Sequence, residues 1–189
     1  QGVSSAASDV YKRQVIIATG VSPRDPKIKG HQKNNVVSYV EVLNGTAQIG
    51  QKVAVIGAGG IGFDVSEYLV HENKSDNKQI EIPKWMKEWG VGDPNKTPGG
   101  LAESGPKPEA AVRQVTLMQR KKQKLGRNLG KTTGWIHRSA LKMKNVQMIG
   151  NVNYEEITSK GIMVSDGELR ENPSCLLYTS PSPRDKRQS

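Results

Sequence analysis

The sequence has little cysteine, few aromatic residues and no long apolar run. A single cysteine, Cys175, excludes an internal disulfide, so we expect a reduced, cytoplasmic setting. No apolar run approaches the roughly 20 residues that a membrane-spanning helix needs, and no stretch resembles a secretory signal. Aromatic residues make up only 5% of the chain, which leaves few rings for stacking nucleic-acid bases. These absences argue against a disulfide scaffold, a membrane protein and a nucleic-acid-binding module.

Positive charge, in contrast, is abundant. The 189 residues carry a formal net charge of +10. Such an excess favours a polyanionic ligand. The phosphate groups of a cofactor, nucleic acid and acidic membranes are the candidates that charge alone leaves open.

Both ends of the sequence differ in composition from its interior. Residues 1–14 are polar and aperiodic, and residues 173–189 are rich in proline, serine and arginine. The strings SSAASDVYKRQ and LLYTSPSPRD resemble translated sequencing-library adapters. We therefore expect non-native tails at 1–14 and 173–189, with natural disordered tails as the alternative.

The clearest local pattern is a strand, a glycine-rich turn and a helix in direct succession. Residues 52–56 read K-V-A-V-I, a β-branched strand, and residues 57–62 read G-A-G-G-I-G. Ile61, Val65 and Leu69 follow at helical spacing and predict a helix to about residue 71. This context is the one in which a G-x-G-x-x-G sequence indicates dinucleotide binding.

Each residue of the turn has an expected role. Gly57 allows the tight turn, Gly59 lets the backbone approach a pyrophosphate, and Gly62 permits close packing of helix on strand. The amides near Gly60 and Ile61 face the phosphates with the positive end of the helix dipole. The alternative is a glycine-rich turn that binds no ligand.

The next strand of the fold decides between NAD and NADP, and the sequence offers two candidates. A count of about 20 residues from the turn reaches Glu81 within the short run 79–82, which would favour NAD. The run 115–118 is the better strand, because a proline follows the first run at once. It leads to Arg120 and Lys121, whose charges suit the 2′-phosphate of NADP(H). The alternative for these bases is a solvated surface loop.

The whole pattern predicts a Rossmann-like, three-layer α/β domain over residues 36–172, with a parallel sheet and a small antiparallel hairpin layer. Residues 72–111 are an insertion with at most one short helix, near 84–89. The other expected elements are a helix near 132–144 with Ile136, Ala140 and Met143 on one face, a strand at 146–149, and a hairpin of 154–157 with 161–164.

At these positions the sequence resembles the C-terminal half of bacterial NADPH-dependent 2,4-dienoyl-CoA reductases, an old-yellow-enzyme-like iron–sulfur flavoprotein family. The matching strings are VIIATGVSPRDPKIKG, KVAVIGAGGIGFDVSEYL, a tryptophan-containing insertion ending in PGGL, VTLMQRK, and LGKTTGWIHR. Together they cover nearly all of residues 15–172. The insertion and the last two strings are the most specific.

The resemblance implies a larger enzyme that transfers hydride from NADPH to FAD. Electrons then pass through a [4Fe–4S] cluster to FMN, which reduces the dienoyl-CoA in unsaturated fatty acid β-oxidation. Thr19 and Gly20 match the strand end that returns from the FAD domain, so 15–35 is a remnant of that domain. The glycines match the NADPH fingerprint, and Arg120 with Lys121 match the 2′-phosphate contacts. The roles of Thr132, Thr133, Trp135, His137 and Arg138 do not follow from the match.

On this interpretation the chain is a fragment without catalytic residues or metal ligands. The FMN barrel, its substrate site and the cluster cysteines would lie upstream, so the isolated fragment should be inactive. One alternative is the same module from another old-yellow-enzyme-like flavoprotein. A second alternative, from a different class, is a basic nucleic-acid-binding module. We expect neither a nucleic-acid nor a membrane partner.

Overall fold

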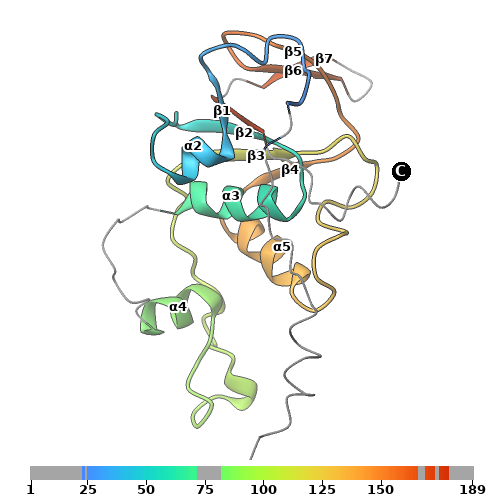
Figure 1. Cartoon of the computed structure of the whole chain (residues 1–189). Helices are drawn as coiled ribbons and strands as arrows, with labels where there is room; N and C mark the ends of the chain where they lie inside the picture. The colour runs from blue at the N-terminus through green and yellow to red at the C-terminus, as the bar shows by residue number, and fades with distance from the viewer. Residues whose placement is uncertain (1–22, 24, 72–81, 166–168, 173–174, 179–189) are drawn as a thin grey trace, which may run out of the picture.

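The computed structural model describes residues 23, 25–71, 82–165, 169–172 and 175–178. These residues form three layers: helices, a five-stranded parallel sheet, and a three-stranded antiparallel sheet (Figure 1). The helices cover one face of the parallel sheet, and the antiparallel sheet covers the other. This architecture confirms the predicted Rossmann-like α/β fold with a parallel sheet and a small antiparallel layer.

The parallel sheet has the strand order β1-β8-β2-β3-β4. Its strands are β1 (Val36–Ser38), β8 (Cys175–Tyr178), β2 (Lys52–Ile56), β3 (Gln114–Met118) and β4 (Gln147–Ile149). Strands β2 and β3 are parallel neighbours along their whole length, with Lys52 opposite Gln114 and Ile56 opposite Met118. The predicted pairing of 52–56 with 115–118 is therefore confirmed, and β3 rather than the run 79–82 takes the second strand position.

Strand β8 departs from the sequence-based expectation of a tail at 173–189. Its four residues pair in parallel with β1 on one side and with β2 on the other. Strand β8 lies between β1 and β2. Without it, the backbone N–H and C=O groups on that edge of β2 would lack hydrogen-bond partners. The composition of the whole segment concealed the short run C-L-L-Y, which is apolar enough for a strand. Residues 1–22 and 179–189 lie outside the described residues, so the rest of the predicted tails stays a prediction.

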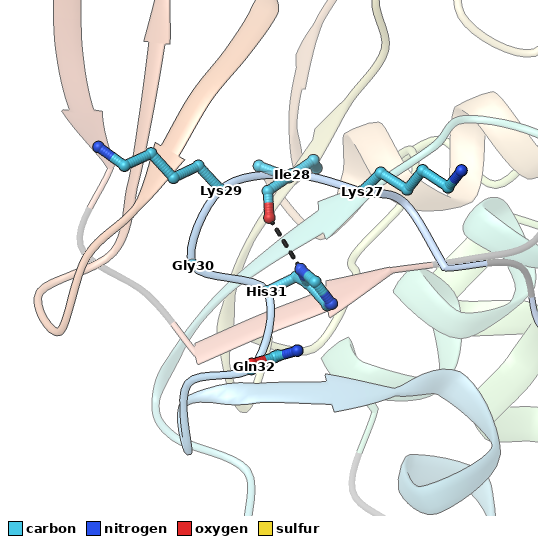
Figure 2. A pocket seen from close by; sticks show the side chains of 6 residues that line it. All are labelled: Lys27, Ile28, Lys29, Gly30, His31 and Gln32. Carbon is cyan, nitrogen blue, oxygen red and sulfur yellow. Dashed lines mark hydrogen bonds between the residues drawn. The ribbon is translucent and has the colours of Figure 1, made fainter.

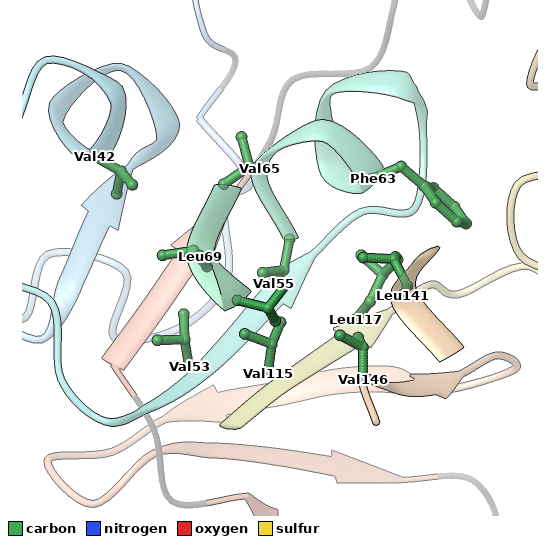
Figure 3. Packing of buried hydrophobic residues seen from close by; sticks show 11 residues of the cluster. Val42, Val53, Val55, Phe63, Val65, Leu69, Val115, Leu117, Leu141 and Val146 are labelled. Carbon is green, nitrogen blue, oxygen red and sulfur yellow. The ribbon is translucent and has the colours of Figure 1, made fainter. Parts of the chain in front are cut away.

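Strands β2 and β3 are buried on both faces, as expected of central parallel strands. Successive side chains point to opposite faces, so each strand contributes to two apolar clusters. The cluster under the helices, shown in Figure 3, contains Val42, Val53, Val55, Phe63, Val65, Leu69, Val70, Val115, Leu117, Leu141 and Val146. The cluster under the antiparallel sheet contains Ile28, Ala54, Ile56, Met118, Val152, Ile157, Ile162 and Val164.

In the part of the chain that the structure describes, three helices accompany the parallel sheet: α2 (Tyr39–Leu43), α3 (Gly60–Val70) and α5 (Gly134–Met143). In α3, Val65 and Leu69 are fully buried, as their spacing predicts. In α5 the expected face was partly wrong, because Ile136 is 37% exposed while Leu141 is fully buried. Ala140 is buried as predicted, and Leu141 packs in one apolar cluster with Phe63 of α3 and Leu117 of β3. Among the described residues, no helix is long and apolar enough to cross a membrane.

The antiparallel layer is a three-stranded meander of β5 (Asn153–Ile157), β6 (Ile162–Ser165) and β7 (Leu169–Asn172). Pairing of β5 with β6 confirms the predicted hairpin. Strand β7 extends it on the far side of β6, with Ile162 opposite Asn172. Its sequence L-R-E-N has no strong strand signal, since a short edge strand needs only backbone pairing.

The described part of the predicted insertion contains one helix, α4 (Ile82–Trp89), and a short 3₁₀ turn, η1 (Pro98–Gly100). It extends from the helix side of the domain, away from the parallel sheet (Figure 1). An ion pair ties it to the domain: Nζ of Lys144, at the end of α5, lies 2.5 Å from Oε1 of Glu88 in α4. The two side chains are only 4% and 17% exposed. Lys144 also donates a hydrogen bond to the carbonyl oxygen of Glu109, at 3.1 Å.

Because this pair is largely buried, its loss should cost more than the loss of a surface pair. Glu88→Gln should lower the free energy of unfolding by about 2–4 kcal/mol, since the Lys144 ammonium would keep its burial but lose its counter-charge. Lys96→Gln is the control: Lys96 pairs with Asp93 at 3.6 Å and is 81% exposed. The control should change stability by less than about 0.5 kcal/mol. Urea titration of both variants tests this, and equal effects would contradict it.

Candidate functional site

The turn between β2 and α3 begins with a residue in the left-handed region. Gly57 has a φ of 105°, a value that side chains with a Cβ rarely adopt. Its N–H donates a hydrogen bond of 2.8 Å to the carbonyl oxygen of Met118, at the end of β3. The turn is thus joined to the neighbouring strand as well as to its own.

Gly62 lies against the start of the same turn. A Cβ added to Gly62 would stand 1.9 Å from the carbonyl oxygen of Gly57 and 3.5 Å from Cδ1 of Leu117. The first contact is far inside van der Waals distance and involves backbone that cannot move aside easily. Gly62 therefore lets the first turn of α3 pack directly on the end of β2.

The middle of the turn, in contrast, is open. A Cβ added to Gly59 or Gly60 would meet nothing within 4 Å. Gly59 is the N-cap of α3 and supplies no side-chain cap, and the hydrogen bond from Phe63 N to Gly59 O, 3.1 Å long, begins the helix. The amides of Gly60 and Ile61 precede that bond and have no acceptor one turn earlier in the helix. No described residue accepts a hydrogen bond from these two amides, and the open space at Gly59 and Gly60 fits the pyrophosphate of a dinucleotide.

A basic loop follows β3 beside this turn. Arg120, Lys121 and Lys122 are exposed and come directly after the strand that pairs with β2. Since the carboxyl ends of neighbouring parallel strands meet at one edge of the sheet, the loop and the glycine turn share that edge. The structure therefore brings the predicted glycines and the predicted bases to one side of the domain.

The rest of the basic loop folds back onto the start of α3. Leu125 and Leu129 pack against the apolar cluster under the helices. A Cβ added to Gly126 would stand 2.8 Å from the ring of Phe63, so the loop backbone touches the first turn of α3. Arg138 of α5 donates a hydrogen bond of 3.1 Å to the carbonyl oxygen of Gly126. These contacts hold residues 125–129 at the amino end of α3.

Tyr154 is a polar group of this region that the sequence did not single out. Among the described residues, its hydroxyl is buried without a hydrogen-bond partner. Burial raises the pKa of Tyr154, and the positive charge of Arg120 acts in the opposite direction. The phenol therefore stays protonated at neutral pH. No feature of the sequence around Tyr154 indicates this proximity, which arises because β5 crosses the face of the sheet opposite the helices.

Some predicted residues fall elsewhere. Thr19, Gly20 and Glu81 lie outside the described residues. Residues 134–143 form α5, and Trp135 in its first turn is 57% exposed. His137 in α5 has its Nδ1 3.6 Å from Oε2 of Glu67 in α3, as a polar residue between two helices would. Within the described ranges, no group of three potential metal ligands occurs.

A surface depression of about 450 Å³ lies away from the glycine turn. It is lined by Lys27, Ile28, Lys29, Gly30, His31 and Gln32 (Figure 2). Two of its polar side chains already have partners: His31 Nδ1 lies 3.0 Å from the carbonyl oxygen of Ile28, and Lys29 Nζ lies 3.1 Å from Glu156 Oε2. The glycine turn, with its open amides, is the better candidate site.

A glycine turn at the end of a parallel strand, followed by a helix and flanked by a basic loop, defines a dinucleotide-binding domain. The chain belongs to the Pyridine nucleotide-disulphide oxidoreductase family, which matches residues 3–179. It is thus a flavin-dependent pyridine nucleotide oxidoreductase domain, and membership implies FAD and NAD(P) as cofactors.

Several known proteins share this sequence pattern or fold. The metal reductase of Desulforamulus reducens is 24% identical over 166 residues, which are 88% of this chain and 23% of that protein. A 2-naphthoyl-CoA reductase in complex with 2-naphthoyl-CoA has a TM-score of 0.61 at 18% identity, covering 86% of this chain and 19% of that one. Thioredoxin reductase of T. acidophilum has a TM-score of 0.52 at 16% identity, covering 86% and 42%. The chain spans less than a quarter of the metal reductase.

Gly59 and Gly62 differ in the space around them, so substitutions at these two positions test the described packing of α3 on the turn. Gly62→Ala should destabilise the domain by at least about 2 kcal/mol, because its methyl group would collide with the Gly57 carbonyl. Gly59→Ala should leave stability within about 0.5 kcal/mol, because its methyl group enters open space at an extended backbone position. Thermal unfolding followed by circular dichroism measures both. A stable Gly62→Ala variant would show that α3 is not packed on the turn as described.

Proposed function

We propose that the chain is the NADP(H)-binding module of a cytoplasmic flavin-dependent reductase, in which hydride passes from NADPH to FAD. One observation carries the choice of nucleotide. Arg120 and Lys121 are exposed at the end of β3, directly beside the strand that ends in the glycine turn. A dinucleotide whose pyrophosphate lies on the turn has its adenosine ribose at the end of this neighbouring strand.

The glycine turn and the basic loop would each bind a different part of the nucleotide. The open turn at Gly59 and Gly60 admits the pyrophosphate, and the first amides of α3 donate hydrogen bonds to it. The guanidinium of Arg120 and the ammonium of Lys121 match the 2′-phosphate, which carries nearly two negative charges at neutral pH. Bound NADPH supplies the hydride. The chain's own residues hold and orient the nucleotide.

Removal of the two bases should weaken NADPH binding selectively. A hydrogen bond to a charged group contributes roughly 1.5–3 kcal/mol, and the exposure of both side chains favours the lower end. Arg120→Ser combined with Lys121→Ala should therefore weaken NADPH about ten- to hundred-fold and leave NADH nearly unchanged. Calorimetric titration of both nucleotides against wild type and the double variant measures this.

Two controls make the result specific. Lys142→Ala with Lys160→Ala removes the same charge from exposed positions outside the site and should leave the preference for NADPH intact. Gly59→Ala should weaken NADPH and NADH alike, because both carry the pyrophosphate. If wild type instead prefers NADH and Glu81→Ala abolishes that preference, Glu81 binds the ribose and the assignment to NADP falls.

A narrower proposal concerns the substrate of the whole enzyme. The strings VTLMQRK and LGKTTGWIHR, with the insertion before them, favour a 2,4-dienoyl-CoA reductase of fatty acid β-oxidation. Such an enzyme also holds FMN and a [4Fe–4S] cluster. The cluster takes four cysteine ligands and this chain has one, so it would be bound elsewhere in the full-length protein. Another old-yellow-enzyme-like flavoprotein reductase is the alternative, because the glycine strings are common to many flavoproteins.

The narrower proposal predicts that the chain by itself is inactive on dienoyl-CoA. Purified chain with NADPH, FAD and FMN should cause no loss of dienoyl-CoA absorbance, because the substrate barrel and the cluster are assigned to other parts of the enzyme. Titration of NADPH binding in the same preparation is the control for a folded protein. An NADPH-dependent loss of dienoyl-CoA, stoichiometric with the chain, would contradict the assignment.

A further inference from the structure

The side chain of Gln119 lies inside the basic loop rather than on its surface. Gln119 is the first residue after β3 and is half-buried. Its Nε2 donates a hydrogen bond of 3.0 Å to the carbonyl oxygen of Lys121 and another to the carbonyl oxygen of Gln123. One amide group therefore closes the loop that carries Arg120 and Lys121.

The loop is also joined to the segment that connects β4 and β5. Asn151 N donates to the Lys121 carbonyl at 3.2 Å, and Gln119 N donates to the Ile149 carbonyl at 3.0 Å. A Cβ added to Gly150 would stand 3.4 Å from the Lys121 carbonyl oxygen, so the two segments are in contact. The carbonyl of Lys121 thus accepts two hydrogen bonds from the inner side of the loop.

This arrangement has an electrostatic consequence. Carbonyl oxygens are partly negative and would repel a phosphate group if they faced it. The carbonyls of Lys121 and Gln123 are instead directed at the Gln119 amide, while the side chains of Arg120 and Lys121 are exposed. The loop therefore presents cations outward and holds its carbonyls inward. Gln119 Nε2 donates to both oxygens.

We propose that Gln119 is a positioning residue for recognition of the 2′-phosphate, acting through the loop that presents Arg120 and Lys121. The inference deepens the proposed function and rests on it. Gln119 does not contact the nucleotide. It orders the backbone of the loop before binding, so that binding of the nucleotide does not have to pay the entropy of ordering that backbone.

The test replaces Gln119 by methionine, which keeps the length of the side chain and removes its donors. Gln119→Met should weaken NADPH by about three- to ten-fold, the range for loss of one or two neutral hydrogen bonds, and change NADH by less than about two-fold. Gln114→Met is the matched control, because Gln114 lies exposed at the opposite end of β3. It should leave both affinities unchanged. Calorimetry and thermal unfolding are measured for each variant.

A double-mutant cycle shows whether Gln119 acts through the two bases. In the Arg120→Ser, Lys121→Ala background, Gln119→Met should cause no further loss of NADPH affinity, because the groups that it positions are gone. An additive further loss would overturn the inference. So would an equal loss of NADPH and NADH in the single variant, since a purely structural role weakens both.

The remaining outcomes separate the inference from the function on which it rests. If wild type prefers NADPH through Arg120 and Lys121 but Gln119→Met keeps the full preference, only the positioning role fails. If wild type shows no preference for NADPH, the proposed nucleotide assignment fails and the inference falls with it. Gln119→Ala, with a smaller side chain, is the second variant. If neither Gln119 variant folds, the residue serves folding itself and the positioning role is overturned.

Discussion

The contact between Gly62 and the carbonyl group of Gly57 is the constraint on which the rest of the site depends. It brings the first turn of α3 against the end of β2, which a side chain at position 62 would prevent. Close packing at this point places Val65 and Leu69 over the central strands, so that the apolar cluster forms around the same helix. The glycines between these two residues, Gly59 and Gly60, border open space at the start of α3. The close approach of Gly62 to the Gly57 carbonyl therefore permits both the packing of the core and the access of a ligand to the turn.

The basic loop after β3 depends indirectly on the packing of α3 against β2. Its strand, β3, is aligned by pairing with β2, and its second half packs through Leu125 and Leu129 on the cluster that α3 completes. Hydrogen bonds from Gln119 and Asn151 then order the segment between these two anchors. Part of the positive charge of the chain, that of Arg120 and Lys121, therefore lies at the end of β3. Basic residues are common on protein surfaces, and these differ in that hydrogen bonds hold the backbone of their loop.

Much of this arrangement could be predicted because its signals are local. The β-branched run at 52–56, the glycines at 57–62 and the spacing of Val65 and Leu69 each depend on neighbouring residues, and all three correspond to the structure. The pairing of β3 with β2 was predicted although a long insertion separates the two strands, because basic residues suited to a 2′-phosphate follow β3. Strand β7 could not be predicted, because a short strand held by backbone pairing carries little side-chain signal. Strand β8 was missed because the polar composition of residues 173–189 concealed its short apolar run. The buried face of α5 was displaced for a similar reason: helical spacing allowed several faces, and contact with α3 selected Leu141 over Ile136.

The sequence by itself determined the class of fold, the pairing of 52–56 with 115–118 and the residues of the glycine turn, because strand periodicity and glycine conformation are properties of short segments. Only the tertiary structure decided which polar groups act together. The charge of Arg120 acts on Tyr154, Lys144 pairs with Glu88, and Gln119 bonds the carbonyl groups of its own loop. Each of these follows from the folding of segments that the sequence leaves independent. Burial and hydrogen-bond geometry depend on distances between such segments. These distances are fixed only when the strands pair and the helices pack.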